Sequence, residues 1–148
     1  RGAKGFPNLT DNDWLWGGEP AAIKTSIMSG RSGVMPPHGA MLDDAAVENT
    51  ANYVLSLSGR EHDAAKAEAG KTQFNTFCIA CHQADGTGNQ MLGAPNLTDE
   101  IWLYGAAPST IKKSIKEGRA GVMPAHEEFL GNDKVHLLTA YIYSLSNK

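Results

Sequence analysis

The sequence predicts an all-α fold, and three observations favour this class. No segment alternates polar and apolar residues over the length of a convincing strand. The run from Asp63 to Thr76 is rich in Ala, Lys, Glu and Gln, which have high helix propensity. A last segment, opened by Asn132 or Asp133, carries apolar residues at helical spacing, namely Val135, Leu138, Tyr141, Ile142 and Leu145. We therefore expect helices joined by turns and loops.

Turn and loop signals follow the helix over 63–76. The sequence Asp-Gly-Thr-Gly at 85–88 predicts a turn, and residues 92–97, with Gly and Pro, predict an extended loop. Thr98 can cap a short helix whose first turn carries two acidic residues, which suits the helix dipole.

A further helix is expected over residues 110–116. Ser109 can serve as its N-cap, and Gly118 can end it. The segment 119–129 is then expected to be a loop that leads into the last helix.

The chain contains two copies of one sequence pattern. Each recurrence has the same offset of 88 residues: 8–17 as 96–105, 23–38 as 111–126, and 53–58 as 141–146. Such regular self-similarity indicates a duplicated domain. We predict a truncated first copy over residues 1–60 and a complete second copy over residues 61–148, with Gly59 as the helix stop at the boundary.

Composition limits the classes of protein that need to be considered. The apolar fraction of 41% is enough for a packed core. The net charge of −3 and the lack of a basic stripe argue against nucleic-acid binding. No run approaches the roughly 18 apolar residues of a membrane-spanning helix, so we expect this fragment to be soluble.

The most specific motif is Cys78-Ile-Ala-Cys81-His82, which has the C-x-x-C-H spacing of covalent haem c attachment. Each thiol can form a thioether with a haem vinyl group, and the imidazole can bind the iron. A thioredoxin-like dithiol should follow a buried strand, and a zinc site needs about four ligands. The residues before Cys78 form a helix-like run with no strand signal, which argues against the dithiol. The two cysteines of the sequence both lie in this motif, so it offers too few ligands for zinc. We expect one covalent haem c per chain.

A methionine is the expected second axial ligand. Met123 lies in a loop marked by Gly and Pro, and its repeat partner Met35 is embedded in the same pattern. Met91 follows His82 too closely to reach the opposite haem face, whereas His126 is a rival ligand near the same loop. Met35 would serve a first haem, whose attachment motif is absent from this sequence.

Three further residues are candidates for contacts with the haem. The carbonyl of Pro95 can accept a hydrogen bond from the second imidazole nitrogen of the ligating histidine. The alternative is that Pro95 only helps to form a turn. Trp102 and Arg119 can donate to haem propionates. The alternatives are a packing role for Trp102 and a solvated loop cation for Arg119.

The second copy resembles class I cytochromes c over residues 61–147. The features that carry the resemblance are Gly70, Phe74, the C-x-x-C-H motif, the loop with Pro95, the Met-Pro pair at 123–124 and the aromatic Tyr141. The resemblance implies the class I cytochrome c fold. It also implies that the first and last helices of the copy cross, with Gly70 or Phe74 against Tyr141.

Both copies together resemble the dihaem subunit III of cbb(3)-type cytochrome c oxidases. The resemblance rests on the repeated Pro-Asn-Leu-Thr-Asp segments and on the repeated Gly-Arg-x-Gly-Val-Met-Pro-x-His block. It implies an electron-transfer domain of a respiratory chain, without catalytic residues of its own. The implied partners are a soluble electron-donor cytochrome and the haem and oxygen-reducing subunits of the oxidase. The implied location is the periplasmic side of the bacterial inner membrane, with the membrane segment outside this sequence.

Two other functions remain open at this stage. The same carrier could serve a periplasmic dehydrogenase or be part of a soluble dihaem cytochrome. A haem-based sensor or peroxidase is a further alternative, and it would need an open sixth position on the iron.

Overall fold

The computed structural model describes residues 2–147, and about half of these residues are helical. The elements in chain order are α1 (Pro20–Ser29), β1 (Arg31–Met35), α2 (Asp44–Leu57), α3 (Ala64–Phe77), α4 (Ile79–His82), α5 (Pro108–Glu117), β2 (Arg119–Met123) and α6 (Glu127–Ser146).

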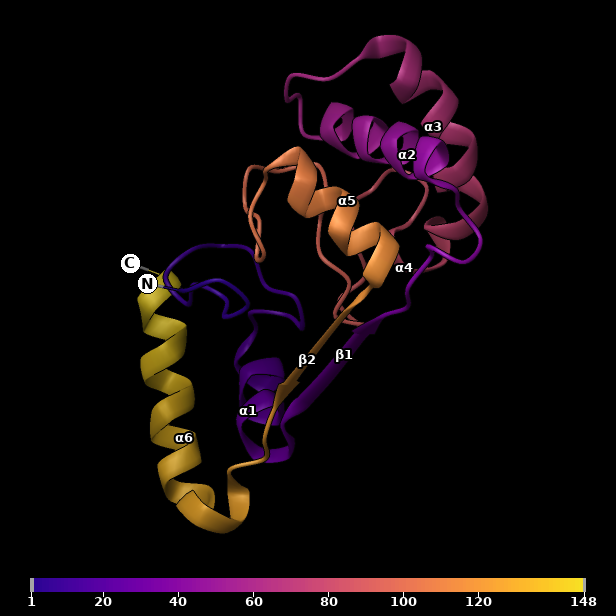
Figure 1. The fold of residues 1–148 in the computed structure, drawn as a ribbon. Coiled ribbons are helices and arrows are strands. Elements are labelled where there is room, and N and C mark those ends of the chain that lie inside the picture. The colour runs from indigo at the N-terminus through magenta and orange to yellow at the C-terminus, as the bar shows by residue number, and fades with distance from the viewer. Residues whose placement is uncertain (1, 148) are drawn as a thin grey trace.

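The two strands connect two separate helical lobes (Figure 1). Helices α2, α3, α4 and α5 form the larger lobe, and α1 and α6 form the smaller one. Strands β1 and β2 pair antiparallel between the lobes, with Gly33 opposite Gly121. Met35 lies opposite Arg119 at one end of the pair, and Met123 lies opposite Arg31 at the other.

The larger lobe is built around Phe74, which is fully buried. The apolar residues buried around it are Leu42, Val47, Ala51, Val54, Leu55, Cys78, Ile111 and Ile115. Helices α2 and α3 approach at Gly70, where a Cβ atom would lie 2.0 Å from the carbonyl oxygen of Asn49. Only glycine allows this approach, so Gly70 fixes the crossing point of the two helices.

The smaller lobe has a core of Ile23, Ile27 and Val135, on which Trp14, Met28, Leu130 and Ile142 pack. Helix α6 bends at Gly131, whose φ of 74° departs from helical geometry. The N–H of His126 donates to the carbonyl oxygen of Ile27 at 3.0 Å, which fixes the start of α6 beside the end of α1.

The last helices of the two copies are exchanged between the lobes. Helix α2, from the first copy, packs on α3 and α5 of the second copy, and α6 packs on α1 of the first. The expected crossing with Tyr141 is therefore wrong. Tyr53 stands in its place, with its ring 5.1 Å from that of Phe74, whereas Tyr141 is 61% exposed. The division into residues 1–60 and 61–148 stays a prediction of the sequence repeat, and the lobes do not follow it.

Helices α3 and α5 lie where the sequence predicts them. The carboxylate of Asp63 accepts from the N–H of Lys66 at 3.0 Å and caps α3. Helix α5 begins at Pro108, before the expected Ser109 cap, and ends at Glu117, with Gly118 as its C-cap at a φ of 72°.

Three expectations about secondary structure are wrong. The all-α prediction missed β1 and β2. In segment 119–129 the first five residues form β2 and the last three begin α6, so only residues 124–126 form the expected loop. Each strand is short, and its pairing partner is remote in sequence, so no local pattern reveals it. No helix follows Thr98, because Asn96 Oδ1 accepts from both the N–H and the hydroxyl of Thr98 and stabilises a turn instead.

Within residues 2–147, none of the helices combines the length and the apolar character needed to cross a membrane.

The exchange predicts that two equivalent tyrosines differ in their effect on stability. Tyr53→Ala should lower the free energy of unfolding by about 3 kcal/mol, because it removes a ring packed on Phe74. Tyr141→Ala should change it by less than about 0.5 kcal/mol, because that ring is exposed. Urea denaturation of both variants checks this. A larger loss for Tyr141→Ala would show that α6 packs on α3 in solution.

Candidate haem-attachment site

The attachment motif lies at the end of α3. The N–H of Cys78 donates to the carbonyl oxygen of Phe74 at 2.9 Å, and the N–H of His82 donates to that of Cys78 at 2.9 Å. Since Cys78 and His82 are four residues apart in one helical turn, they share a face. Both are buried, and Cys81 is half-buried.

The two cysteines are free thiols. Burial, with a smaller effect of Cys81, raises the pKa of Cys78 to about 11. The Cys78 thiol is therefore protonated at neutral pH. Reactive dithiols of the thioredoxin type need a lowered thiol pKa, so the surroundings of Cys78 argue against redox exchange as its role.

The imidazole of His82 is held in the tautomer that suits metal binding. Its Nδ1 lies 3.1 Å from the carbonyl oxygen of Pro95, which can only accept, so Nδ1 carries the proton and Nε2 keeps its lone pair. Burial lowers the pKa of His82, and His38 lowers it further, while the Pro95 hydrogen bond acts in the opposite direction. The neutral imidazole is the form that binds iron.

Backbone hydrogen bonds fix the loop that presents Pro95. The N–H of Gly88 donates to the carbonyl oxygen of His82 at 3.0 Å, and the N–H of Leu97 donates to that of Gly86 at 2.7 Å. Asn89 and Ala94 close the loop with two further bonds. The expected Pro95 carbonyl is thus in place for the histidine.

Trp102 has a buried donor that lacks an acceptor. Its indole packs against the core of the larger lobe, and its Nε1 finds no hydrogen-bond partner among the described residues. A buried N–H without a partner is costly, so its presence points to an acceptor supplied by a bound group. A carboxylate such as a haem propionate would fit, which is one of the two roles that the sequence leaves open for Trp102, and the packing of the indole fits the other.

The guanidinium of Arg119 is engaged close to its own segment. Nε donates to Ser114 Oγ at 2.8 Å, Nη2 donates to the carbonyl oxygen of Thr110 at 3.4 Å, and the guanidinium carbon lies 4.4 Å from the centre of the Tyr104 ring. Arg31 makes the equivalent contacts in the first copy. The propionate role of Arg119 stays a prediction, because these contacts occupy much of its donor capacity.

The structure brings Met35, and not Met123, into the lobe of His82. Met35 is half-buried and packs against the core that contains Cys78. Met123 lies at the opposite end of the sheet and is 39% exposed. The rival ligand His126 lies beside Ile27 in the smaller lobe.

The other two residues that bear on the second ligand are His38 and Met91. His38 is the repeat partner of the rival His126 and lies in the larger lobe, 6.2 Å from the ring of Phe77. Like Trp102, it has a buried nitrogen, Nδ1, without a partner among residues 2–147. The sequence analysis did not consider His38, although the repeat made it visible. Met91 is 86% exposed.

Comparison with known proteins supplies the family. The family model described as "Cytochrome C oxidase, cbb3-type, subunit III" matches residues 65–142. The chain belongs to this family. That match spans α3, the attachment motif, α5, β2 and most of α6.

Individual relatives agree with the subunit III assignment. The cbb3-type oxidase subunit CcoP of Rubrivivax gelatinosus is 48% identical over 99% of this chain and 48% of the relative. The subunit FixP of Azorhizobium caulinodans is 45% identical over 97% of this chain and 52% of the relative. CcoP of Cereibacter sphaeroides is 41% identical over 97% and 53%, respectively. The chain thus spans about half the length of these curated relatives.

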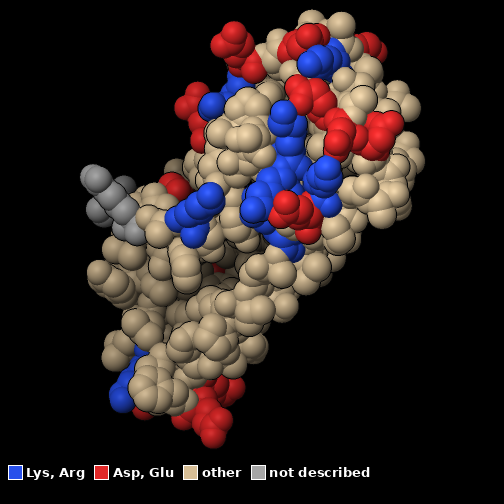
Figure 2. Space-filling model, in the orientation of Figure 1, with Lys and Arg blue, Asp and Glu red and all other residues tan. Residues whose placement is uncertain are grey.

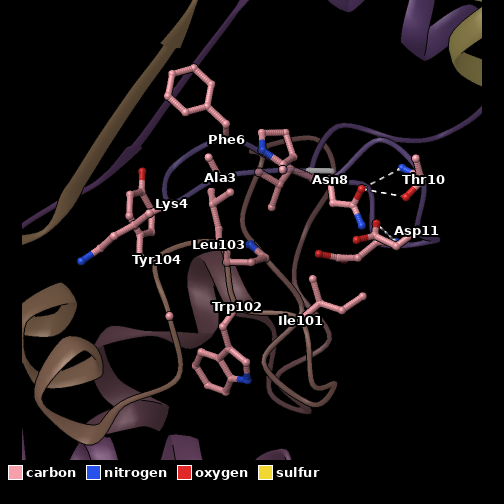
Figure 3. Close-up of a pocket in the computed structure, with 16 residues that line it drawn as sticks. Ala3, Lys4, Phe6, Asn8, Thr10, Asp11, Ile101, Trp102, Leu103 and Tyr104 are labelled. Atoms are coloured by element: carbon pink, nitrogen blue, oxygen red, sulfur yellow. Dashed lines mark hydrogen bonds between the residues drawn. The ribbon is translucent and has the colours of Figure 1, made fainter.

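A cleft of about 600 Å³ borders the site and is lined by residues of both copies (Figure 3). Pro95, Ile101 and Trp102 line one side, and the segment from Gly2 to Leu15 lines the other. Asn8 holds Thr10 by hydrogen bonds to its N–H and hydroxyl at 3.2 and 2.8 Å.

Asp13 is a half-buried carboxyl group at this cleft. Burial raises its pKa to about 6, and the negative charges of Asp99 and Asp11 add to the effect. Because Asp13 and Asp99 come from different copies, their repulsion acts across the junction.

Alanine substitutions at two glycines of similar φ test whether the loop with Pro95 holds His82 in place. Gly88→Ala should lower stability by more than Gly105→Ala, because the Gly88 Cβ would meet Ala94 O at 2.5 Å, whereas the Gly105 Cβ meets nothing within 4 Å. The strain at positive φ alone is about 1 kcal/mol. Urea denaturation, with NMR of the His82 Nδ1 proton, measures both effects. Equal losses for the two variants would contradict the role of the loop.

The pKa of Asp13 predicts a pH dependence. Its folded pKa of about 6 lies above the unfolded value of about 3.9, so the folded chain binds more protons between them. The free energy of unfolding should therefore fall as pH rises through this window. Because solvent screens the half-exposed carboxylate, we expect a fall of about 1 kcal/mol. Asp13→Asn should remove it, whereas an unchanged pH profile in that variant would refute the assignment.

Proposed function

We propose that this chain binds one covalent haem c through Cys78 and Cys81, with His82 as an axial ligand, and transfers electrons within a cbb3-type oxidase. The observation that supports this most directly is the arrangement at His82. A neutral imidazole with Nδ1 hydrogen-bonded to Pro95 and a free Nε2 stands beside two free thiols.

The cysteines form the covalent link. Each sulfur would form a bond to a vinyl carbon, and the thiol proton would go to the neighbouring vinyl carbon, so the addition needs no external oxidant. The bound haem would supply one-electron exchange at its iron. The helical turn of α4, with Cys78 as its N-cap, would hold both thiols and the imidazole at fixed relative positions during attachment.

The surrounding residues orient and shield the site. The loop with Pro95 holds the His82 ring at a fixed angle, and Trp102 offers its indole N–H to a propionate. The core around Phe74 excludes water from one side. We further propose that a methionine fills the sixth position, which would leave no open site for ligand chemistry and favour electron transfer over a sensor or a peroxidase.

The names of the relatives support a proposal about partners. Their names describe subunits of cbb3-type oxidases. We propose that this chain likewise interacts with the haem and oxygen-reducing subunits of such an oxidase and with a soluble donor cytochrome. We place it on the periplasmic side of the bacterial inner membrane.

Production of the chain in a bacterium with a haem c attachment system tests the proposal. Mass spectrometry of the denatured protein should show one added haem, and a double Cys78→Ala, Cys81→Ala variant should lose all covalent haem. Met91→Ala, at an exposed site, is the control and should keep it. A wild-type chain that retains two free thiols and no haem under these conditions would overturn the proposal.

A further inference from the structure

We infer that Trp16, a residue of the first copy, is a positioning residue for His82. Its indole ring packs on the loop that presents the Pro95 carbonyl, and through this loop it holds the imidazole at a fixed angle. The inference deepens the proposed function and rests on it, because it takes His82 as the ligand of a haem attached to the second copy.

The ring and the loop meet at Gly93. A Cβ atom at Gly93 would lie 2.3 Å from both Cε2 and Cζ2 of Trp16, so the ring fills the space that any other side chain would need. The φ of Gly93 is 65°, a backbone conformation that favours glycine. Glycine therefore allows the ring to lie directly against the backbone, two residues before Pro95.

This loop buries little apolar surface of its own. At its tip, Met91 is 86% exposed and Leu92 is 49% exposed. Two backbone hydrogen bonds between Asn89 and Ala94, at 2.9 and 3.0 Å, set the shape of the loop but do not attach its tip to the rest of the protein. The large apolar ring of Trp16 supplies that attachment.

Contacts within the first copy hold Trp16 in place. The guanidinium carbon of Arg31 lies 5.0 Å from the centre of the ring, within the range of a cation–π interaction. Arg31 is itself fixed, because its Nε donates to Ser26 Oγ at 2.8 Å and its Nη2 donates to the carbonyl oxygen of Ala22 at 3.3 Å. A Cβ atom at Gly33 would lie 3.5 Å from Cζ2 of the ring. The ring is thus tied to α1 and β1.

The repeat supplies a matched contact for comparison. Tyr104 is the counterpart of Trp16, and Gly5 is the counterpart of Gly93. A Cβ atom at Gly5 would lie 3.5 Å from Cε1 of Tyr104, which is an ordinary van der Waals distance. Of the two contacts, the tighter one therefore lies at the loop that holds His82.

The two lobes are joined by strands and loops rather than by packed helices. Within residues 2–147 the extensive helix contacts lie inside each lobe, between α2 and both α3 and α5 in one and between α1 and α6 in the other. Figure 2 shows the surface hollowed where the lobes meet. A shift of the smaller lobe would therefore reach His82 through the ring of Trp16 and the loop on which it packs.

NMR of the haem-loaded ferrous chain tests the inference. Trp16→Leu should speed the solvent exchange of the His82 Nδ1 proton about tenfold or more, because a loop without its anchor opens more often. Trp16→Phe retains a ring and should keep most of the protection. The matched variant Tyr104→Leu should leave the exchange of the His82 proton unchanged.

The backbone amide of Cys78 separates positioning from general stabilisation. This amide donates to the carbonyl oxygen of Phe74 at the end of α3, so its exchange reports opening of the larger lobe as a whole. In Trp16→Leu the His82 proton should exchange faster while the Cys78 amide stays protected. An equal increase at both sites would mean that Trp16 only stabilises the fold, and the inference would be wrong.

A second pair of variants approaches the contact from the loop and does not depend on whether Trp16→Leu folds. Gly93→Ala and Gly5→Ala add the same methyl group at positive φ, with values of 65° and 83°. Gly93→Ala should speed the exchange of the His82 proton, because its methyl group displaces the ring, whereas Gly5→Ala should not. Equal effects of the two variants on His82 would contradict the inference.

Failure of the inference can be told apart from failure of the proposed function. An unchanged His82 exchange rate in Trp16→Leu, with haem still attached, would overturn the inference alone. A wild-type chain without covalent haem would overturn the proposed function, and the inference with it.

Discussion

The antiparallel pairing of β1 with β2 determines the rest of the arrangement. Because the strands run in opposite directions between the lobes, each copy sends its last helix to the other. The larger lobe then contains the attachment motif, the helix α2 and Met35, although these come from two copies of the repeat. A duplicated sequence makes such an exchange available at low cost, because equivalent segments compete for the same packing surface.

Within the larger lobe, one backbone carbonyl links the loop to the histidine. Pro95 selects the tautomer of His82, and the loop that carries Pro95 also leads to Trp102 at the adjoining cleft. The same segment therefore contacts the proposed ligand His82 and carries the proposed propionate donor Trp102.

Much of the helical structure could be predicted from local signals. Asp63 as the cap of α3 and Gly118 as the stop of α5 act through hydrogen bonds and backbone geometry within a few residues. The expected helix after Thr98 failed because the Asn96 side chain offered the backbone a competing turn. The strands could not be predicted, since their pairing joins residues from the two copies that are remote in sequence, such as Arg31 and Met123.

The sequence by itself determined the attachment motif and the duplication, because these depend on short spacings and on repetition. It left two roles open for Pro95, and the structure shows the contact of its carbonyl oxygen with His82. Only the tertiary structure decided which methionine lies in the lobe of His82. Met35 and Met123 stand in nearly identical sequence, so no local reading separates them. The choice follows from which helix fits α3 and α5, and that depends on the backbone contact at Gly70 and on the charges of Asp44 and Glu48.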